Sequence, residues 1–358
     1  MIITQLDFTS FRNIRHATLS PHPALNLITG NNGSGKSSIL EAVQCLATGH
    51  SFRTRKPREL INHSDQSYQL TCTFVDKMTD AEHRAGLMRS RDGAVNLRLD
   101  FEDVKTQSTI TRLLPVKAMT PDSLGLVLDG PDSRRQFLDW GLFHVEHDFL
   151  GHWRTFRRSL SQRNQVIRDM GSDKEIDTWN TSLLPAAQAI DAARKSYLVK
   201  LETAMQLRLQ KMSIEFHVEL AYRRGWSESH SLEELLSKNL QHHRKMKTTT
   251  EGPHRADLLV YTNDILAKQV LSRGQLKVLT YVMHLAQLDV LLDERTQTAI
   301  VLCDDVNSEL DEFHTNALLS QLSELESQVF VTGISLEQLF HFPHQRFHMK
   351  HGTLENRL

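Results

Sequence analysis

A glycine-rich stretch near the amino terminus, GNNGSGKSS at residues 30–38, combines residue types that suit phosphate binding. It fits the pattern G-x-x-x-x-G-K-[ST], and it lies between an apolar, strand-like run and a helical pattern, as that pattern requires. Its glycines let backbone N–H groups turn toward phosphates, Lys36 neutralises phosphate charge, and Ser37 is a candidate Mg²⁺ ligand. We therefore predict nucleotide binding by Gly30, Asn31, Asn32, Gly33, Ser34, Gly35, Lys36, Ser37 and Ser38.

A second stretch with chemical potential is IVLCDDV, residues 300–306, an apolar run that ends in two carboxylates. An ordinary strand that ends in an acidic turn would have the same pattern. Beside a phosphate loop, the pattern favours a Walker B strand. In that interpretation Asp304 holds Mg²⁺ and Asp305 polarises the attacking water, so Lys36, Asp304 and Asp305 are the predicted catalytic residues.

A third stretch decides between classes of phosphate-loop protein. LSRGQLK, residues 271–277, resembles the signature sequence of ATP-binding-cassette (ABC) ATPases, and SELD, residues 308–311, resembles their D-loop. In that superfamily the signature closes over the γ-phosphate held by a partner subunit, which assigns nucleotide contacts to Ser272, Gly274 and Gln275. A phosphate-loop kinase needs neither element, and a transporter subunit lacks a long insert at this place.

The elements that must position these residues divide the chain into three parts. Residues 24–29 predict a strand, residues 37–49 a helix that stops at Gly49, and residues 67–75 and 94–101 strands of an antiparallel sheet. Helical periodicity dominates from about residue 132 to residue 247, and α/β character returns afterwards. We predict an α/β fold: an ABC-type ATPase lobe of the Rad50/SMC-head kind from residues 1–114 and 256–358, with an inserted, mainly helical lobe at residues 115–255.

Composition limits the function further. The 358 residues carry a net charge of −1, so the chain is no basic nucleic-acid coat and any DNA contact must come from a local patch. We see no signal peptide and no run of 18 apolar residues, which predicts a cytoplasmic protein without a membrane span. Three distant cysteines are expected to be buried thiols, and neither they nor the His242–His243 doublet predicts a metal site.

Four stretches together resemble the RecF family of bacterial recombination-mediator ATPases. They are FTSFRNI at residues 8–14, PDSLGLVLDGPDSRRQFLD at 121–139, GPHRADL at 252–258 and LCDDVNSELDEFHTNALL at 302–319. With the cassette stretches they span nearly the whole chain in order. One departure is Asp129, which stands where the family pattern has glycine.

The resemblance implies an ATP- and Mg²⁺-dependent homodimer that binds double-stranded or gapped DNA in repair, replication-fork maintenance and the SOS response. It also implies partners RecR and RecO, which help load RecA onto single strands coated by SSB. The alternative is another SMC-like, DNA-associated ATPase that acts in defence. By the same resemblance Arg12 and Asn13 contact the nucleotide.

Departures from the wider cassette pattern suggest slow hydrolysis that releases a DNA clamp. The base position holds an aspartate, Asp305, and Thr332 and Gly333 stand where many cassettes have a switch histidine. A Q-loop glutamine is not assignable; residues 120–122 lie in that region, with Asp122 expected near the metal.

Three basic runs could bind DNA, although each could equally be a solvated face. We favour Arg53, Arg55, Lys56 and Arg58, which follow the phosphate-loop helix. The others are Arg154, Arg157, Arg158 and Arg163 on a predicted helix, and Arg244, Lys245 and Lys247. Arg134 and Arg135 either link nucleotide state to the helical lobe or form surface ion pairs.

Overall fold

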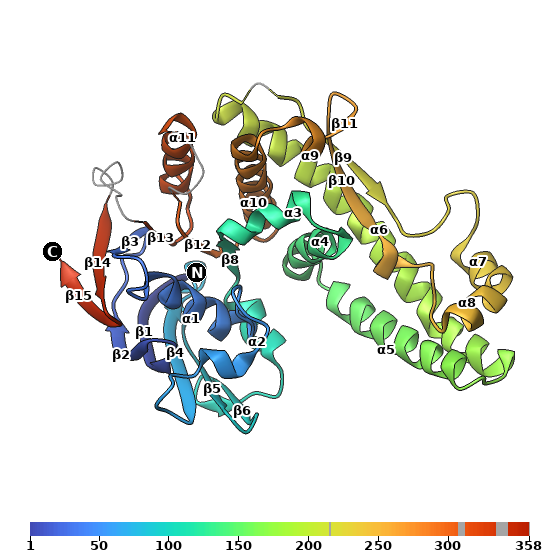
Figure 1. The fold of residues 1–358 in the computed structure, drawn as a ribbon, viewed down its shortest axis with the longest axis horizontal. Coiled ribbons are helices and arrows are strands. Elements are labelled where there is room, and N and C mark those ends of the chain that lie inside the picture. Colours follow the sequence, from blue (N-terminus) through green and yellow to red (C-terminus); the bar gives the residue numbers. More distant parts are fainter. Residues whose placement is uncertain (215, 307–311, 334–342, 358) are drawn as a thin grey trace. The chain divides into compact units, whose positions relative to one another are not determined.

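The computed structural model describes residues 1–214, 216–306, 312–333 and 343–357, and it separates the chain into two compact units (Figure 1). The first, the ATPase unit, comprises Met1–Leu124, Arg273–His284 and Leu292–Leu358. The second, the helical unit, comprises Gly125–Ser272 and Leu285–Leu291. Helix α10 (Arg273–Arg295) contributes residues to both units.

A six-stranded sheet in the ATPase unit holds the predicted phosphate loop and Walker B strand. Its order is β15-β14-β3-β13-β12-β8, and all neighbours except β14 and β15 are parallel. Because parallel strands end at the same edge of a sheet, the residues that follow them converge there. The strands are β3 (Leu25–Gly30), β8 (Val116–Met119), β12 (Ile300–Cys303), β13 (Val329–Thr332), β14 (His344–Lys350) and β15 (Thr353–Arg357).

A second, antiparallel sheet and helix α1 (Lys36–Thr48) complete the core of this unit. Alternate residues of β4, namely Tyr68, Leu70, Cys72 and Phe74, are buried, as the period of two predicts. Helix α1 ends at Gly49, which adopts φ 75°, at the position predicted from sequence. The sheet order is β2-β1-β4-β5-β6-β7, with β1 (Ile2–Phe11), β2 (Ile14–Leu19), β4 (Ser67–Val75), β5 (Glu82–Ser90), β6 (Val95–Leu99) and β7 (Glu102–Asp103).

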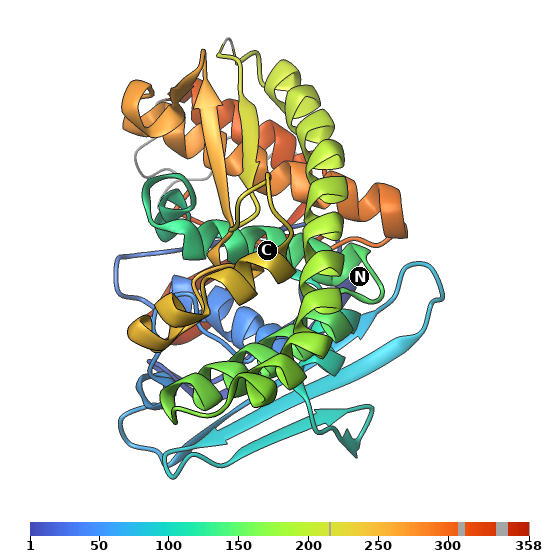
Figure 2. The same ribbon diagram turned by 90° about the vertical axis from the view of Figure 1, so that its right-hand side faces the viewer.

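The helical unit is built around the long helices α5 (Phe149–Arg168) and α6 (Asp173–Lys211), which pack against each other and appear in green and yellow-green in Figure 2. A capping box of Ser172 and Glu175 starts α6. The unit also contains a three-stranded antiparallel sheet in the order β11-β10-β9. The remaining elements are α3 (Gly125–Leu128), α4 (Pro131–Val145), β9 (Glu219–Arg223), α7 (Leu232–Lys238), α8 (Leu240–Met246), β10 (Asp257–Thr262), β11 (Ile265–Leu266) and α9 (Ala267–Val270).

Both predicted boundaries of the inserted lobe need correction. Strand β8 pairs with β12, with Val116 opposite Ile300, so the ATPase unit extends to Leu124 rather than to residue 114. Strand β10 pairs with β9, with Leu258 opposite Tyr222, so residues 256–272 belong to the helical unit. Both boundaries depend on pairing between strands that are far apart in the sequence. The hydrophobic period of a segment does not indicate which distant strand it pairs with.

The cysteines are buried, as the sequence predicts, and His243 of the histidine doublet is buried as well. Cys45, Cys72 and Cys303 are buried free thiols, and burial raises their pKa. His243 is fully buried and pairs with Glu251 at 2.5 Å. Among the helices of the described ranges, none is both long and apolar enough to cross a bilayer.

Candidate nucleotide-binding site

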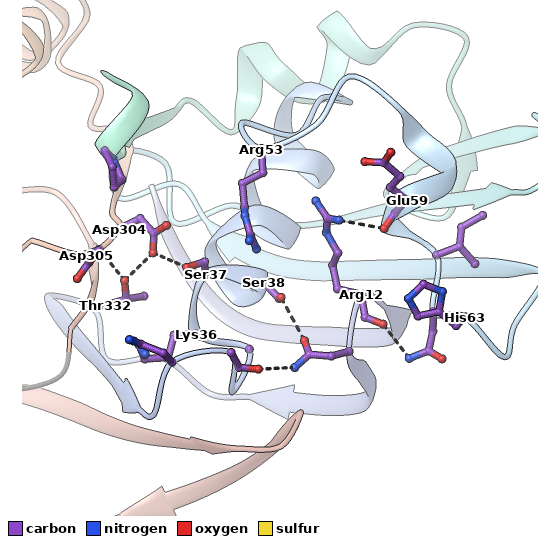
Figure 3. A pocket seen from close by; sticks show the side chains of 17 residues that line it. Arg12, Lys36, Ser37, Ser38, Arg53, Glu59, His63, Asp304, Asp305 and Thr332 are labelled. Atoms are coloured by element: carbon purple, nitrogen blue, oxygen red, sulfur yellow. Dashed lines mark hydrogen bonds between the residues drawn. The ribbon is translucent and has the colours of Figure 1, made fainter. Parts of the chain in front are cut away.

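A cavity of about 480 Å³ opens in the ATPase unit where β3, β12 and β13 end (Figure 3). The glycine loop, the residues after β12 and the turn between β1 and β2 surround it, so segments far apart in sequence meet in one place. Its lining includes these residues predicted from sequence: Arg12, Asn13, Asn32, Gly33, Gly35, Lys36, Ser37, Ser38, Asp304, Asp305 and Arg53.

The loop between β3 and α1 has the backbone shape that phosphate binding requires. Gly30, Gly33 and Gly35 have φ values of 144°, 77° and 113°, a range that side chains other than hydrogen rarely tolerate. A Cβ on Gly30 would also lie 2.4 Å from the carbonyl oxygen of Met349. The Lys36 ammonium donates to the carbonyl oxygens of Gly30 at 2.7 Å and Asn31 at 3.1 Å, so it lies along the inner side of the loop.

The predicted metal ligands Ser37 and Asp304 are in direct contact. The Ser37 hydroxyl donates to Asp304 Oδ1 at 2.8 Å, and the Thr332 hydroxyl donates to the same oxygen at 2.7 Å. Asp304 is 7 % exposed, so the two hydroxyls hold a nearly buried carboxylate in one orientation. Hydroxyl and carboxylate oxygens are the hard ligands that Mg²⁺ takes, and the pair therefore fits the ion that the sequence implied.

Asp305 points into the same cavity from an unusual backbone conformation. It is exposed, its φ is 51°, and its N–H donates to the Thr332 hydroxyl at 2.9 Å. Left-handed conformations of residues other than glycine concentrate at functional sites. The turn separates the roles of the two acids, because Asp304 is enclosed while Asp305 reaches solvent within the pocket.

The Arg12 guanidinium is occupied by a partner that sequence analysis did not identify. It donates through Nε and Nη2 to the two carboxylate oxygens of Glu41, at 2.9 and 2.6 Å. Glu41 is fully buried on α1, and it also accepts from the Ser51 hydroxyl. Burial acts to lower the pKa of Arg12, but the ion pair with Glu41 outweighs it and raises that pKa. Arg12 thus lines the pocket and anchors α1 at once.

Asn13 links the turn after β1 to the phosphate loop. Its side-chain N–H donates to the backbone carbonyl of Ser34 at 3.2 Å, and its side-chain oxygen Oδ1 accepts from the Ser38 hydroxyl at 3.2 Å. A Cβ on Gly35 would lie 3.0 Å from the Asn13 side chain, so close packing favours glycine there in addition to the backbone angle. Asn13 therefore supports the loop as well as lining the pocket.

Several predicted residues lie apart from this lining. Gly30, Asn31 and Ser34 shape the loop without lining the cavity. Gly274 and Gln275 begin α10 and do not line it either, and Ser272 is assigned to the helical unit. Pro121 lines the pocket but the exposed Asp122 does not. The D-loop stretch, residues 308–311, lies outside the described residues.

The basic runs separate into exposed and structural arginines. Arg53 lines the nucleotide pocket, whereas Arg55, Lys56 and Arg58 are exposed outside its lining. Arg163, predicted as part of a DNA-binding face, is fully buried instead: it donates to Asn180 at 2.8 Å and Thr249 at 2.6 Å.

Arg134 and Arg244 are also held by carboxylates. Arg134 pairs with Asp257 at 2.7 Å, and Arg244 pairs with Asp173 at 2.5 Å. For Arg134 the sequence left a surface ion pair open as one of two alternatives; the ion pair is present, but Arg134 is buried.

Glu41 is a site residue that sequence reasoning missed, and Thr332 was named only for its place in the switch-histidine region; each leaves a signal. Thr332 ends an apolar strand, QVFVT, in the same way that Asp304 ends IVLC. Glu41 is a lone acid within the apolar helix SSILEAVQCLA, where a buried carboxylate requires a cation. The other missed residues in the lining are Glu59, Ile61, Asn62 and His63.

Comparison with known proteins agrees with this arrangement over nearly the full length. Residues 2–351 match the family model described as the RecF/RecN/SMC N terminal domain. A protein of Shewanella baltica (strain OS223) named DNA replication and repair protein RecF is 38 % identical over 360 residues, which cover 99 % of each chain. A protein of the same name from Shewanella frigidimarina is 36 % identical over 358 residues, with 99 % of each chain covered.

Solved structures show the same fold. A structure entitled "Structure of the recombination mediator protein RecF-ATP in RecFOR pathway" superposes with a TM-score of 0.89 at 23 % identity, covering 100 % of this chain and 98 % of the other. An SMC head bound to the C-terminal winged-helix domain of ScpA gives 0.60 at 14 % identity, covering 99 % and 96 %. The predicted α/β fold, an ATPase lobe of the SMC-head type with an inserted helical lobe, is thus confirmed.

Proposed function

Because the chain belongs to the RecF family, we propose that it is an ATP-dependent, DNA-binding dimer that acts in recombinational repair and replication-fork maintenance. The meeting of the phosphate loop with the Ser37–Asp304 pair in one open pocket carries the proposal. The family name favours this role over the alternative of an SMC-like ATPase acting in defence. We place its action in the cytoplasm.

ATP and Mg²⁺ are the proposed ligands of the pocket. The Lys36 ammonium exchanges the carbonyls of Gly30 and Asn31 for oxygens of the β- and γ-phosphates, and the backbone N–H groups of the loop bind the remaining phosphate charge. Ser37 and Asp304 hold Mg²⁺, which neutralises charge on the phosphates. Asp305 polarises the attacking water, and its short side chain is consistent with slow turnover.

The composite nucleotide site is completed by a second copy of the chain. Ser272, Gly274 and Gln275 do not belong to the lining that contains Lys36, so their proposed ligand is the nucleotide of the partner molecule. Two chains then enclose two ATP molecules, and hydrolysis reopens the dimer.

The dimer is proposed to bind double-stranded or gapped DNA and to act with RecR and RecO in loading RecA onto SSB-coated strands. Arg55, Lys56 and Arg58 remain the proposed DNA contacts, because they are exposed and lie outside the pocket. Phosphate contacts of this kind give affinity that falls steeply with salt and depends little on sequence. Arg53 lines the pocket, so we propose that it contacts the nucleotide rather than DNA.

Sedimentation velocity with and without ATP–Mg²⁺ tests the composite site. We expect the parent protein to change from monomer to dimer only with ATP. Lys36→Met is expected to lose ATP binding and therefore dimerisation, whereas Ser272→Arg is expected to bind ATP normally and stay monomeric. Ser237→Arg, an exposed serine of α7, is the matched control and should dimerise like the parent.

Three outcomes would contradict the proposal. If Lys36→Met dimerised with normal affinity, dimerisation would not depend on bound nucleotide. Loss of ATP binding in Ser272→Arg would place Ser272 in its own chain's site. A parent protein that stays monomeric at saturating ATP, both with and without duplex DNA, would exclude the clamp.

Turnover of the Asp305→Asn variant separates hydrolysis from binding. We expect this variant to bind ATP and dimerise but to hydrolyse ATP at least about 100-fold more slowly, the scale of a lost general base. An unchanged rate would remove Asp305 from the chemistry and leave a nucleotide-binding clamp.

A further inference from the structure

The stretches at residues 125–139 and 252–258, which belong to two of the stretches that resemble the RecF family, meet inside the helical unit. Arg135 donates to the carbonyl oxygen of Ala256 at 2.5 Å. Arg194, on α6, bridges the two stretches, since it donates to Asp139 Oδ1 at 2.7 Å and to the Pro253 carbonyl at 2.8 Å. The nucleotide site uses none of these three contacts, so the function proposed above does not account for this junction.

A cavity of about 280 Å³ lies at the junction, between α4, α5, α6 and the short helical turn at Pro253–Arg255. Phe149 and Phe156, 3 % and 1 % exposed, form part of its wall, and Trp153 lies beside them. The cavity therefore combines an aromatic interior with the charged side chains of α4 and α5. Its volume lies just below the roughly 300–1,000 Å³ of pockets for small molecules, so it has room for a single large side chain.

The charges around the cavity leave one cation without a carboxylate. Arg135 pairs with Asp132, and Arg194 pairs with Asp139. Arg157 is exposed, its guanidinium lies 5.0 Å from the Trp153 ring centroid, and it pairs with no carboxylate in the described part of the chain.

His254 adds no charge to the lining at neutral pH. Burial lowers the pKa of His254 to about 4, and its Nε2 lies 3.2 Å from the Thr249 carbonyl oxygen. The lining of the cavity thus carries one net positive charge, on Arg157.

We propose that this cavity is a docking site for a segment of a partner protein that inserts an aromatic or large aliphatic side chain and places a carboxylate on Arg157. The aromatic wall accounts for the apolar side chain, and the single unmatched guanidinium accounts for the carboxylate. A DNA duplex fits less well, because it would bring a row of phosphates against the carboxylates of Asp132 and Asp139.

N-acetyl-L-phenylalanine is the smallest probe of this chemistry, since it has one aromatic ring and one carboxylate. Binding is followed in the full chain, without nucleotide, by fluorine NMR after incorporation of 5-fluorotryptophan. All four tryptophans, Trp140, Trp153, Trp179 and Trp226, lie in the helical unit. The Trp153 resonance is assigned as the one that disappears in Trp153→Phe.

We expect the Trp153 resonance to shift and saturate with a Kd of about 1 mM, the scale of a small fragment. N-acetyl-L-phenylalaninamide, which lacks the carboxylate, should bind at least about fivefold more weakly, as should the acid in Arg157→Gln. Arg158→Gln is the matched control, because Arg158 is the neighbouring exposed arginine and does not line the cavity. Its affinity for the probe should equal that of the parent.

Several results would overturn the docking site. They include no shift of the Trp153 resonance at about 20 mM probe, a concentration well above the expected Kd. If the acid and the amide bound with equal affinity, or if the parent and Arg157→Gln bound the acid equally, the carboxylate would have no role in binding. A duplex oligonucleotide that displaces the probe would identify a DNA surface, and a Trp153 shift with protein concentration alone would identify a contact between copies of this chain.

Discussion

The candidate nucleotide pocket and the helical unit both contain several cations, but the two regions differ in how many of these cations have fixed carboxylate partners. In the pocket, the Lys36 ammonium donates to backbone carbonyls of its own loop, and the Arg53 side chain is 49 % exposed and lies 4.0 Å from Glu41. In the helical unit, buried arginines have fixed side-chain partners: Arg134 with Asp257, Arg194 with Asp139, and Arg208 with Asp289. Lys36 and Arg53 can exchange partners when a ligand arrives, whereas Arg12, held by Glu41, and the buried arginines of the helical unit are part of the packing.

Arginines that are neighbours in one basic run of the sequence can differ completely in burial. In the stretch at residues 154–163, Arg158 is exposed while Arg163 has no exposed surface at all. Burial lowers the pKa of Arg163 to about 10, which leaves it charged at neutral pH and dependent on its partners. A basic run can therefore contain both a surface for ligands and a structural element.

The largest expected effect is on the structural side of the comparison. We expect Arg163→Ala to lower the free energy of unfolding of the helical unit by about 3–5 kcal/mol, because it strips a buried polar network of its cation. Urea unfolding followed by tryptophan fluorescence measures this unit alone, since all four tryptophans lie in it. Arg158→Ala should change the value by less than about 0.5 kcal/mol. Equal effects of the two substitutions would contradict the distinction.

Low pH should lower the free energy of unfolding of the helical unit through protonation of His254. Its pKa is about 4 in the folded chain, against an ordinary value of 6.5, so the unfolded chain binds the extra proton first as pH falls. Stability from this group is complete above pH 6.5 and is lost as pH falls toward 4, by at most about 3 kcal/mol. His254→Asn keeps a side-chain donor and should flatten the pH dependence of tryptophan-detected unfolding in that range. An unchanged slope would show that His254 does not drive it.

Arg12 tests whether the pocket also contains a structural cation. We expect Arg12→Gln to destabilise the ATPase unit by about 2–3 kcal/mol, since it leaves the buried Glu41 carboxylate without its bidentate partner. Hydrogen exchange of the α1 amides measures the loss, and the double variant Arg12→Gln/Glu41→Gln should recover part of it. Weaker ATP binding with unchanged exchange would instead assign Arg12 to the nucleotide alone.

The smallest effect is expected at Thr332. We expect Thr332→Val to weaken Mg²⁺–ATP binding about tenfold, or about 1–2 kcal/mol, because Asp304 and the Asp305 N–H each lose a hydrogen bond. Thr332→Ser retains the hydroxyl and should bind like the parent in isothermal titration calorimetry. If valine and serine behave alike, the hydroxyl does not position the metal ligand.

Local sequence patterns predicted most of the helices and strands named in the sequence analysis, but not all of the residues at which they begin and end. The helix after the phosphate loop and the strand at residues 67–75 follow from period and end signals within a few residues. The helical stretch at residues 134–160 breaks into α4, which ends at Val145, and α5, which begins at Phe149. Its apolar period continues through the break, so the pattern alone contains no sign of it.

The sequence predicts phosphate binding by the loop at residues 30–38 and metal and water contacts for Asp304 and Asp305, because these predictions depend on residue types at fixed short spacing. The tertiary structure places Thr332 between them, since β13 pairs with both β3 and β12. It also decided that Arg12 binds Glu41 and that Arg163 is buried. Those partners come from segments distant in the chain, and their pairing depends on how the sheets and helices pack rather than on any local period.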